Sequence, residues 1–332
     1  MVLWVLILLS AIAIEFCFAM RTEIKMVRNF KEQTEAHYIA LAGLNRAIFE
    51  LLRNESSPEK KKLLPDENEE TAETDSRWRM NTDIPPVPFA AGRFKIHIKN
   101  EAGKININTA DEPLLKMMLN GFEIEEQEKS IIVDSIMDWR DENDLHRMNG
   151  AENDYYQSLP EPYDCKNGDF DAIEELLMVR GVTPEIFYGG LREMVTAFQD
   201  QGSKRGKIRR RPSKAGGSKI CINAASRAML LSLPQMTEDL AQSIIDFRKE
   251  SDFKSMGEVP TLLGANVYGA ISPYVTLQAS PYYQVLSVGG IKGSSTRQGV
   301  SMVVEINPTL KERYRVIQWD DLAAFSEVQP LI

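Results

Sequence analysis

Carboxylates and asparagines occur together in one stretch of this sequence, residues 138–164. Crowded carboxylates repel one another unless solvent separates them or a cation binds between them. Oxygen ligands suit a hard cation, and Ca²⁺ fits them better than a transition metal. The spacing is not that of an EF-hand, because Asn143 is followed directly by Asp144 and Leu145. Two interpretations stay open, a calcium site and a solvated acidic loop. The carboxylates and amides concerned are Asp138, Asp141, Glu142, Asn143, Asp144, Asn149, Glu152, Asn153 and Asp154.

Nucleophiles and bases for enzyme catalysis are not grouped in the sequence. The three histidines, His37, His97 and His146, are scattered, and neither a G-x-S-x-G motif nor a Cys/His pairing is present. We therefore expect no enzymatic activity, and we expect each histidine to be a surface residue.

The composition is that of a folded, acidic protein. The chain has 332 residues, of which 43% are apolar and 26% charged, and its formal net charge is −9. This length allows two or three compact modules, and the negative charge argues against a general nucleic-acid binder. Three cysteines are too few for a disulfide framework. Cys17 lies in an apolar run, so we expect Cys165 and Cys221 to be buried thiols, with a disulfide as the alternative in an oxidising compartment.

The N-terminal segment predicts one long helix. Residues 1–20 are apolar except for Ser10 and Glu15, and about 20 apolar residues cross a bilayer as a helix. Over residues 21–52 apolar side chains recur every three or four positions between charged ones, as in an amphipathic helix. A cleaved signal peptide is the alternative, but no basic region precedes the run and no small-x-small cleavage site follows it.

Composition divides the rest of the chain into segments. Proline and charge mark a linker at 53–91, and Lys, Arg, Gly and Ser mark a second, basic linker at 200–218. Between and after the linkers we expect the first strand and turn of a sheet at 92–103, a helical unit at 104–199, a second helical unit at 219–277, and the C-terminal strands of the sheet at 278–332.

Alternating apolar residues predict the strands of an antiparallel sheet. Phe94, Ile96 and Ile98 alternate with polar residues, and we expect a hairpin turn at 100–103 followed by a second strand at 104–108. Three further strands are expected at the C-terminus, over Tyr282–Gly289, Gly299–Ile306 and Tyr314–Trp319.

The two helical units nearly repeat each other. KININTA at Lys104 is echoed by KICINAA at Lys219, and both are followed by helical patterns. The first unit alone carries an insertion at about 141–169. The units resemble helix-hairpin-helix and SAM-like modules, but the Gly-x-Gly hairpin that binds phosphate in DNA-binding members is absent from both. We therefore interpret the repeated apolar residues as core, and the basic tract as a linker rather than as a binder of nucleic acid or anionic lipid.

A long helix that begins as an anchor and ends on a soluble head resembles the class III pilins and pseudopilins. Four further motifs are present: Asn106-Ile107-Asn108-Thr109-Ala110, Asp138-Trp139-x-Asp141, Asn149-Gly150-Ala151-Glu152-x-Asp154-Tyr155-Tyr156 and Glu174-x-Leu176-x-x-Val179-Arg180-Gly181-Val182-Thr183. With them the chain resembles the general secretion pathway protein K family of minor pseudopilins, and the resemblance covers nearly the whole chain. The resemblance implies an α+β fold, in which a large helical domain of two helix-hairpin-helix-like or SAM-like units is inserted into a pilin-like head.

The same resemblance implies a role and partners. The protein would cap the tip of the type II secretion pseudopilus, in a complex with two other minor pseudopilins above the major pseudopilin fibre. It also implies processing by a prepilin peptidase, methylation, and structural Ca²⁺ in the acidic loop. The metal ligands carried over by the resemblance are Asp141, Asp144, Asn149, Glu152 and Asp154.

The resemblance also implies a location. We expect a single-pass protein of the inner membrane with its head in the periplasm. Basic residues follow the apolar run, and the positive-inside rule alone would place them in the cytoplasm. Pilins have a basic leader before the run, which would reverse that orientation, but no such leader precedes the run here. The alternative function is a membrane-tethered DNA-binding protein of the competence type, built on helix-hairpin-helix units.

Overall fold

The computed structural model describes residues 2–55, 78–80, 83–198 and 219–321. The basic linker predicted at 200–218 and most of the linker predicted at 53–91 lie outside these residues. The chain folds as two compact units. Unit 1 comprises Met1–Arg79, Asp83–Ile98 and Tyr283–Ile332, and unit 2 comprises Met80–Thr82 and Lys99–Tyr282.

The first element of unit 1 is a single long helix, as the periodicity predicts. Helix α1 spans Val2–Glu55. Within the described residues it is the one helix long and apolar enough to cross a bilayer, which is compatible with a transmembrane anchor. From Ala36 onward its apolar side is buried in the core of unit 1, whereas residues 2–31 are exposed all round. The amphipathic half thus packs on the head, and the apolar half stays exposed.

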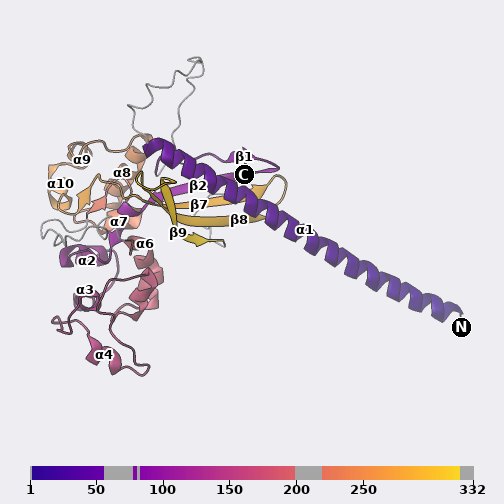
Figure 1. Ribbon diagram of the computed structural model, residues 1–332, viewed down its shortest axis with the longest axis horizontal. Coiled ribbons are helices and arrows are strands. Elements are labelled where there is room, and N and C mark those ends of the chain that lie inside the picture. Colours follow the sequence, from indigo (N-terminus) through magenta and orange to yellow (C-terminus); the bar gives the residue numbers. More distant parts are fainter. Residues whose placement is uncertain (1, 56–77, 81–82, 199–218, 322–332) are drawn as a thin grey trace, which may run out of the picture. The chain divides into compact units, whose positions relative to one another are not determined.

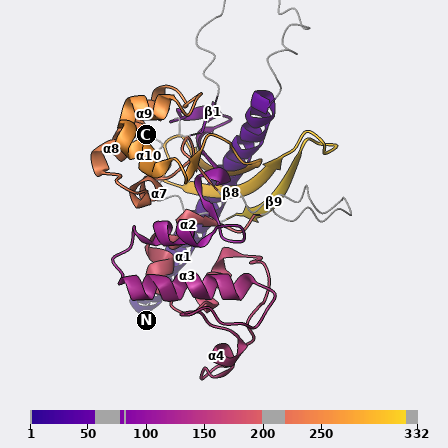
Figure 2. The same cartoon turned by 90° about the vertical axis from the view of Figure 1, so that its left-hand side faces the viewer.

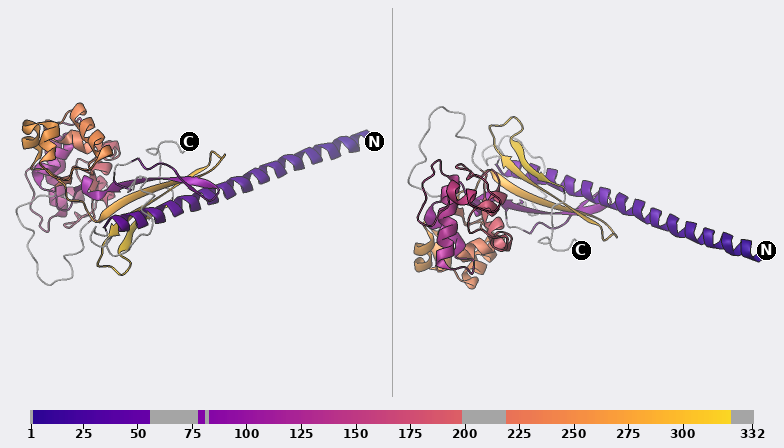
Figure 3. Two further views of the ribbon diagram at one scale, coloured as in Figure 1. Left: turned by 90° about the horizontal axis from the view of Figure 1, so that it is seen from above. Right: turned by 90° about the horizontal axis from the view of Figure 1, so that it is seen from below.

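A five-stranded sheet forms the rest of unit 1, and α1 runs along it (Figures 1 and 3). The strands lie in the order β1-β2-β7-β8-β9. Their bounds are β1 Val87–Phe89, β2 Gly92–Asn100, β7 Tyr282–Ile291, β8 Arg297–Ile306 and β9 Tyr314–Asp320. Pairs β1/β2 and β8/β9 are antiparallel. The three C-terminal strands predicted from the sequence are confirmed.

Helix α1 passes very close to Gly289 of β7. A Cβ atom there would lie 2.1 Å from the carbonyl oxygen of Ala36 and 2.5 Å from the backbone nitrogen of Ala40. Only glycine permits this contact, because a side chain would collide with main-chain atoms that cannot move aside.

The hairpin predicted after the first strand is wrong. The second strand shortens to β3, Ile105–Asn106, and pairs in parallel with β4, Val195–Thr196, rather than with β2. The neighbour of β2 on that side is β7. The chain turns away through the 3₁₀ helix η2, Glu101–Gly103, where the Asn100 side chain accepts a hydrogen bond from the Ala102 N–H. The hairpin that does form joins β1 to β2, and β1 lies in the segment predicted as linker.

Unit 2 contains the two predicted repeats, here called repeat 1 (residues 104–198) and repeat 2 (residues 219–277). Figure 2 shows α2 beside α3 in repeat 1, and α8, α9 and α10 grouped in repeat 2. Repeat 1 contains α2 Glu112–Leu119, α3 Glu126–Arg140, α4 Asn153–Gln157, the 3₁₀ helix η3 Ile173–Met178, α5 Pro184–Ile186, the π-helical turn η4 Phe187–Leu191 and α6 Arg192–Met194. Repeat 2 contains β5 Ile220–Cys221, α7 Arg227–Ser232, α8 Glu238–Glu250, α9 Glu258–Leu263, α10 Ala265–Ile271 and β6 Val275–Thr276.

The repeats share a polar framework as well as a sequence pattern. In repeat 1 the Asn108 side chain bonds both the carbonyl oxygen and the N–H of Phe170, and in repeat 2 Asn223 bonds Phe253 in the same way. Each repeat opens on a short strand that pairs in parallel with its last one. These bonds satisfy buried backbone groups that would otherwise cost stability, and one apolar core spans both repeats.

An arginine at the end of the second helix completes this framework. Arg140 donates to the carbonyl oxygens of Ile107 and Ala110. Its counterpart Arg248 donates to those of Ile222 and Ala225 at 2.8 Å each. We call these contacts the arginine staples.

Candidate metal site

The insertion of repeat 1 brings three carboxylates together. Asp138 lies in the last turn of α3, Asp141 is the C-cap of that helix, and Glu152 is the N-cap of α4. One carboxylate oxygen from each lies within 4.8 Å of the other two. Among the residues that the structure describes, this is the one group of three or more such ligands. The chain thus leaves α3 after Asp141 and returns at Glu152 to the end of the same helix.

Two of these carboxylates are fully buried and incompletely paired. Asp138 is 0% exposed and Glu152 1% exposed. Oδ1 of Asp138 and both carboxylate oxygens of Glu152 have no hydrogen-bond partner in the structure. Asp138 still has the Arg147 guanidinium 3.6 Å from Oδ1, whereas Glu152 has beside it only the Cys165 thiol, a weak donor. A buried carboxylate without full pairing is costly, so Glu152 above all needs a proton or a cation.

The environment shifts both carboxyl groups toward their protonated forms. Burial, and next the charge of Asp138, raises the pKa of Glu152 to about 7. Burial also raises the pKa of Asp138, against a backbone hydrogen bond from Arg147 that lowers it. Crowded carboxylates with raised pKa values are a mark of functional sites, although ion-pair networks also shift pKa values.

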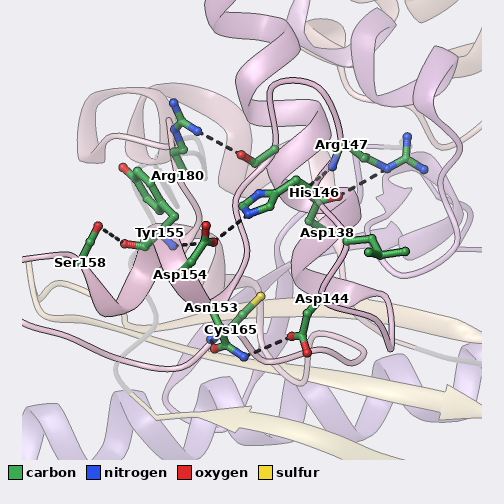
Figure 4. Close-up of polar contacts among 12 residues, drawn as sticks. Asp138, Asp144, His146, Arg147, Asn153, Asp154, Tyr155, Ser158, Cys165 and Arg180 are labelled. Atoms are coloured by element: carbon green, nitrogen blue, oxygen red, sulfur yellow. Dashed lines mark hydrogen bonds and ion pairs between the residues drawn. The ribbon is translucent and has the colours of Figure 1, made fainter.

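Gly150, Arg147 and Arg180 fix the loop beside Asp138; Figure 4 shows Arg147 next to Asp138 and Arg180 next to Tyr155. A Cβ atom on Gly150 would lie 1.8 Å from Oδ2 of Asp138, so only glycine lets the loop pass there. The Arg147 N–H donates to the same oxygen at 3.2 Å. Arg180 donates to the Gly150 carbonyl oxygen at 3.0 Å, and its guanidinium stacks 4.6 Å from the centre of the Tyr155 ring.

The ligands expected from the family resemblance do not all meet at this cluster. Asp141 and Glu152 do. The backbone N–H and side-chain amide of Asn149 both donate to Asp134 Oδ2, at 3.1 and 3.0 Å. Asp154 forms an ion pair of 2.8 Å with His146, which lowers the pKa of that carboxyl.

Asp144 lies near the cluster but outside it. Its Oδ1 accepts hydrogen bonds from the side-chain amides of Asn153 at 3.3 Å and Asn167 at 2.8 Å. Its charge still contributes to the raised pKa of Glu152.

The sequence-derived ligand set omitted Asp138, which the structure places at the centre of the cluster. A signal existed, because residues three apart on a helix face the same side. Asp138 and Asp141 are three apart at the end of α3. Three carboxylate oxygens at this spacing can bind one hard cation, and the cation would supply the positive charge that the buried oxygens lack.

Repeat 2 has no buried carboxylate at the corresponding position. The residue that corresponds to Asp138 is Asp246, two positions before the staple arginine in each repeat, and Asp246 is exposed. Three residues later repeat 1 has Asp141, whereas repeat 2 has Lys249, whose ammonium donates to Asp246 Oδ1 at 2.8 Å on the surface. That bond lowers the pKa of Asp246. The buried carboxylate is therefore particular to repeat 1.

The cysteines are free in this structure. Cys165 and Cys221 are buried thiols, as expected, and Cys17 is exposed. Burial raises the pKa of Cys165 to about 12 and that of Cys221 above its usual value. Both thiols are thus unreactive packing residues.

Comparison with known proteins agrees with the resemblance. Residues 95–200 match the family model of the type II secretion system protein K. No curated protein matches the chain significantly. Among solved structures, the chain is similar to a chain in the crystal structure of the GspK-GspI-GspJ complex from the enterotoxigenic Escherichia coli type 2 secretion system. The identity is 13% and the TM-score 0.54, over 92% of this chain and 100% of that one.

Neither comparison supports a DNA-binding protein of the competence type. The solved structure has the same fold, an α+β arrangement with a long N-terminal helix, an antiparallel sheet and further helices. Residues 95–200 thus resemble protein K of the type II secretion system, and the chain shares its fold with a chain of the solved GspK-GspI-GspJ complex.

Proposed function

We propose that this minor pseudopilin caps the tip of the secretion pseudopilus. The proposal rests on the place in the sequence at which unit 2 is inserted into unit 1. Strands β2 and β7 are hydrogen-bonded neighbours in one sheet, yet residues 101–281, almost the whole of unit 2, lie between them in the sequence. A helical insertion of this size in a pilin-like head is an obstacle to stacking another subunit on it.

Replacement of residues 104–277 by a short Gly-Ser loop tests the capping role. Because β2 and β7 are adjacent, unit 1 retains its sheet and its helix, and the variant should still insert into membranes. Pseudopilus length, measured by electron microscopy in cells that lack the wild-type protein, should increase, and secretion should fall. Unchanged fibre lengths together with normal secretion would remove the capping role.

The same proposal covers anchoring and partners. Helix α1 would hold the protein in the inner membrane with its head in the periplasm, and two other minor pseudopilins would join it above the major pseudopilin fibre. The similar solved chain comes from a complex of GspK with GspI and GspJ, which supports this choice of partners. Deletion of residues 1–21 should release the head from membranes while leaving its fold intact. A truncated head that still sediments with membranes would contradict the anchor.

We propose in addition that a prepilin peptidase processes the chain and that the mature N-terminus is methylated, as in the pilin class. Mass spectrometry of the N-terminal peptide, from cells with and without the peptidase, tests both modifications. An unprocessed, unmethylated terminus in secreting cells would exclude them.

Finally, we propose that Ca²⁺ binds the insertion of repeat 1 as a structural ion, held by Asp138, Asp141 and Glu152. The support is three buried carboxylate oxygens without a hydrogen bond, Oδ1 of Asp138 and both oxygens of Glu152, and the preference of Ca²⁺ for oxygen ligands. Gly150→Ala should weaken calcium binding, because its Cβ would collide with Asp138 Oδ2. Gly168→Ala is the matched control, since its Cβ would meet only the Lys166 carbonyl oxygen at 3.8 Å. Equal calcium affinity for both variants would contradict this site.

A further inference from the structure

The guanidinium of Arg147 lies between the carboxylate cluster and a second carboxylate, Glu112. Its Nε lies 3.6 Å from Oδ1 of Asp138, and its Nη1 lies 3.6 Å from Oε2 of Glu112, which is in the first turn of α2. Figure 4 shows Arg147 beside Asp138. Asp138 is fully buried, whereas the Glu112 side chain is 41% exposed. The guanidinium thus bridges a buried carboxylate of the cluster and an exposed one outside it.

The backbone and the side chain of Arg147 contact different oxygens of Asp138. The Arg147 N–H donates to Oδ2 at 3.2 Å. The guanidinium faces Oδ1, which accepts no hydrogen bond in the structure and is therefore the oxygen that Asp138 can offer to a cation. A separation of 3.6 Å is an ion pair without a hydrogen bond. The side chain can consequently move away from Oδ1 while the loop backbone keeps its place.

A cation bound to Oδ1 and the guanidinium of Arg147 would repel each other. A bond between Ca²⁺ and a carboxylate oxygen is about 2.4 Å long. Because the guanidinium lies 3.6 Å from the same oxygen, the two positive charges would be at most about 6 Å apart. The Arg147 side chain is 37% exposed, so water screens this repulsion. In water, a double and a single charge at about 6 Å repel enough to weaken binding about tenfold.

We propose that Arg147 is a built-in counterion of the calcium site, which competes with the cation for Asp138 and retreats to Glu112 when the cation binds. The inference rests on the calcium site of the proposed function. In the empty site Arg147 neutralises part of the charge of the cluster. Its displacement costs binding energy, so Arg147 sets the calcium concentration at which the insertion is loaded.

Glu112 is suited to receive the displaced guanidinium. Lys116 pairs with its Oε1 at 2.7 Å, which leaves Oε2 to Arg147. Glu112 lies on α2, whereas Asp138 and Asp141 lie at the end of α3. The exchange of partners therefore needs only a movement of the Arg147 side chain, and it links the state of the cation site to α2.

A purely structural arginine would give a result of the opposite sign. If Arg147 only held the loop in place, its loss would loosen the cluster and weaken calcium binding. If Arg147 competes with the cation, its loss strengthens calcium binding. The sign of the change in affinity therefore distinguishes the two roles.

Calorimetric titration of the full chain in detergent with Ca²⁺ measures this sign. Arg147→Gln should bind calcium about tenfold more tightly than the wild type, and the difference should shrink at high salt. Lys116→Gln is the matched control, because it removes the same charge from the other side of Glu112 and leaves both ion pairs of Arg147 in place. Its affinity should stay within about twofold of the wild type.

A second substitution tests the retreat to Glu112. Glu112→Gln should weaken calcium binding about threefold, because the displaced guanidinium then lacks its second partner. Most of that weakening should vanish when Glu112→Gln is combined with Arg147→Gln, since both substitutions act through the same ion pair. Thermal unfolding in chelator checks that each variant is folded.

Three results would overturn the counterion role. The first is a folded Arg147→Gln variant with an affinity equal to or weaker than that of the wild type. The second is an unchanged affinity of Glu112→Gln, a surface substitution that does not endanger the fold. The third is a weakening by Glu112→Gln that persists in full without Arg147. All three leave the calcium site standing, because the wild type still binds calcium. A wild-type chain that binds no calcium would instead contradict the proposed site itself.

Discussion

Removal of calcium should destabilise the protein, and the loss should grow as the pH rises through 7. The pKa of Glu152 is raised from 4.5 to about 7 in the cation-free fold. When the pKa of a carboxyl group is higher in the folded state than in the unfolded state, the group stabilises the fold. This stabilisation is complete at a pH below the unfolded-state pKa, and it is lost as the pH rises through the folded-state pKa. At about 1.4 kcal/mol per pKa unit, the shift corresponds to about 3 kcal/mol between pH 4.5 and pH 8. The raised pKa of Asp138 acts in the same direction.

A bound cation removes this penalty, because it binds the ionised carboxylates. A ligand that binds only the folded state adds about 3 kcal/mol at a hundred times its dissociation constant. Thermal unfolding of the full chain in detergent, with calcium or with a chelator, measures the difference. We expect the chelator to change the melting temperature little at pH 5 and to lower it on the order of 10 °C at pH 8.

Glu152→Gln separates this mechanism from a general effect of pH. Without the ionisable group, the variant should be more stable than the wild type in chelator at pH 8, and calcium should no longer raise its melting temperature. Glu161→Gln, an exposed acid of the same insertion, should behave as the wild type. The reasoning is refuted if the wild type in chelator is equally stable at both pH values, or if Glu152→Gln keeps the full calcium response.

Three other substitutions test the cluster, the close approach and the staple. Asp141→Lys should make the melting temperature independent of calcium, because it removes one carboxylate of the cluster and places an ammonium near Asp138 and Glu152, and a retained calcium shift in melting would contradict this. Gly289→Ala should lower the free energy of unfolding by about 3 kcal/mol in chemical denaturation, because the added Cβ would collide with the helix backbone. Gly269→Ala is the control, since nothing lies near its added Cβ. It should be neutral or stabilising by about 0.5–1 kcal/mol. Arg248→Met should cost about 3 kcal/mol or more by leaving two buried carbonyl oxygens unpaired, and an unchanged unfolding midpoint would show that the staple is dispensable.

Much of the fold follows from local patterns. The 3.6-residue periodicity predicted α1, and alternation predicted β7, β8 and β9 to within a few residues. The wrong hairpin has a long-range cause. Residues Ile105–Asn106 have the composition of a strand, but their partner is Val195–Thr196, about ninety positions away. Periodicity shows that a segment is extended, but not which segment it pairs with.

The candidate site was only partly predictable for a related reason. The acidic insertion stands out by composition, yet composition does not say which carboxylates are buried. Asn149 and Asp154 fit a ligand motif equally well, but each has a nearer partner in the fold, Asp134 and His146 respectively. Asp138 became central because Gly150 lets the loop backbone close over it. Burial, which the sequence does not contain, decides between a ligand and a surface charge.

The duplication in unit 2 separates what serves the fold from what serves another purpose. The asparagine bonds and the arginine staples occur in both repeats, so the helical fold requires them. Among the described residues, the carboxylate cluster occurs only in repeat 1. At the corresponding position repeat 2 has Asp246, an exposed residue that pairs with Lys249 on the surface. The helical fold of repeat 2 thus forms without a buried carboxylate at this position, so the cluster of repeat 1 is not a requirement of the shared fold. Buried carboxylates that the fold does not require are the residues on which the proposed calcium site rests.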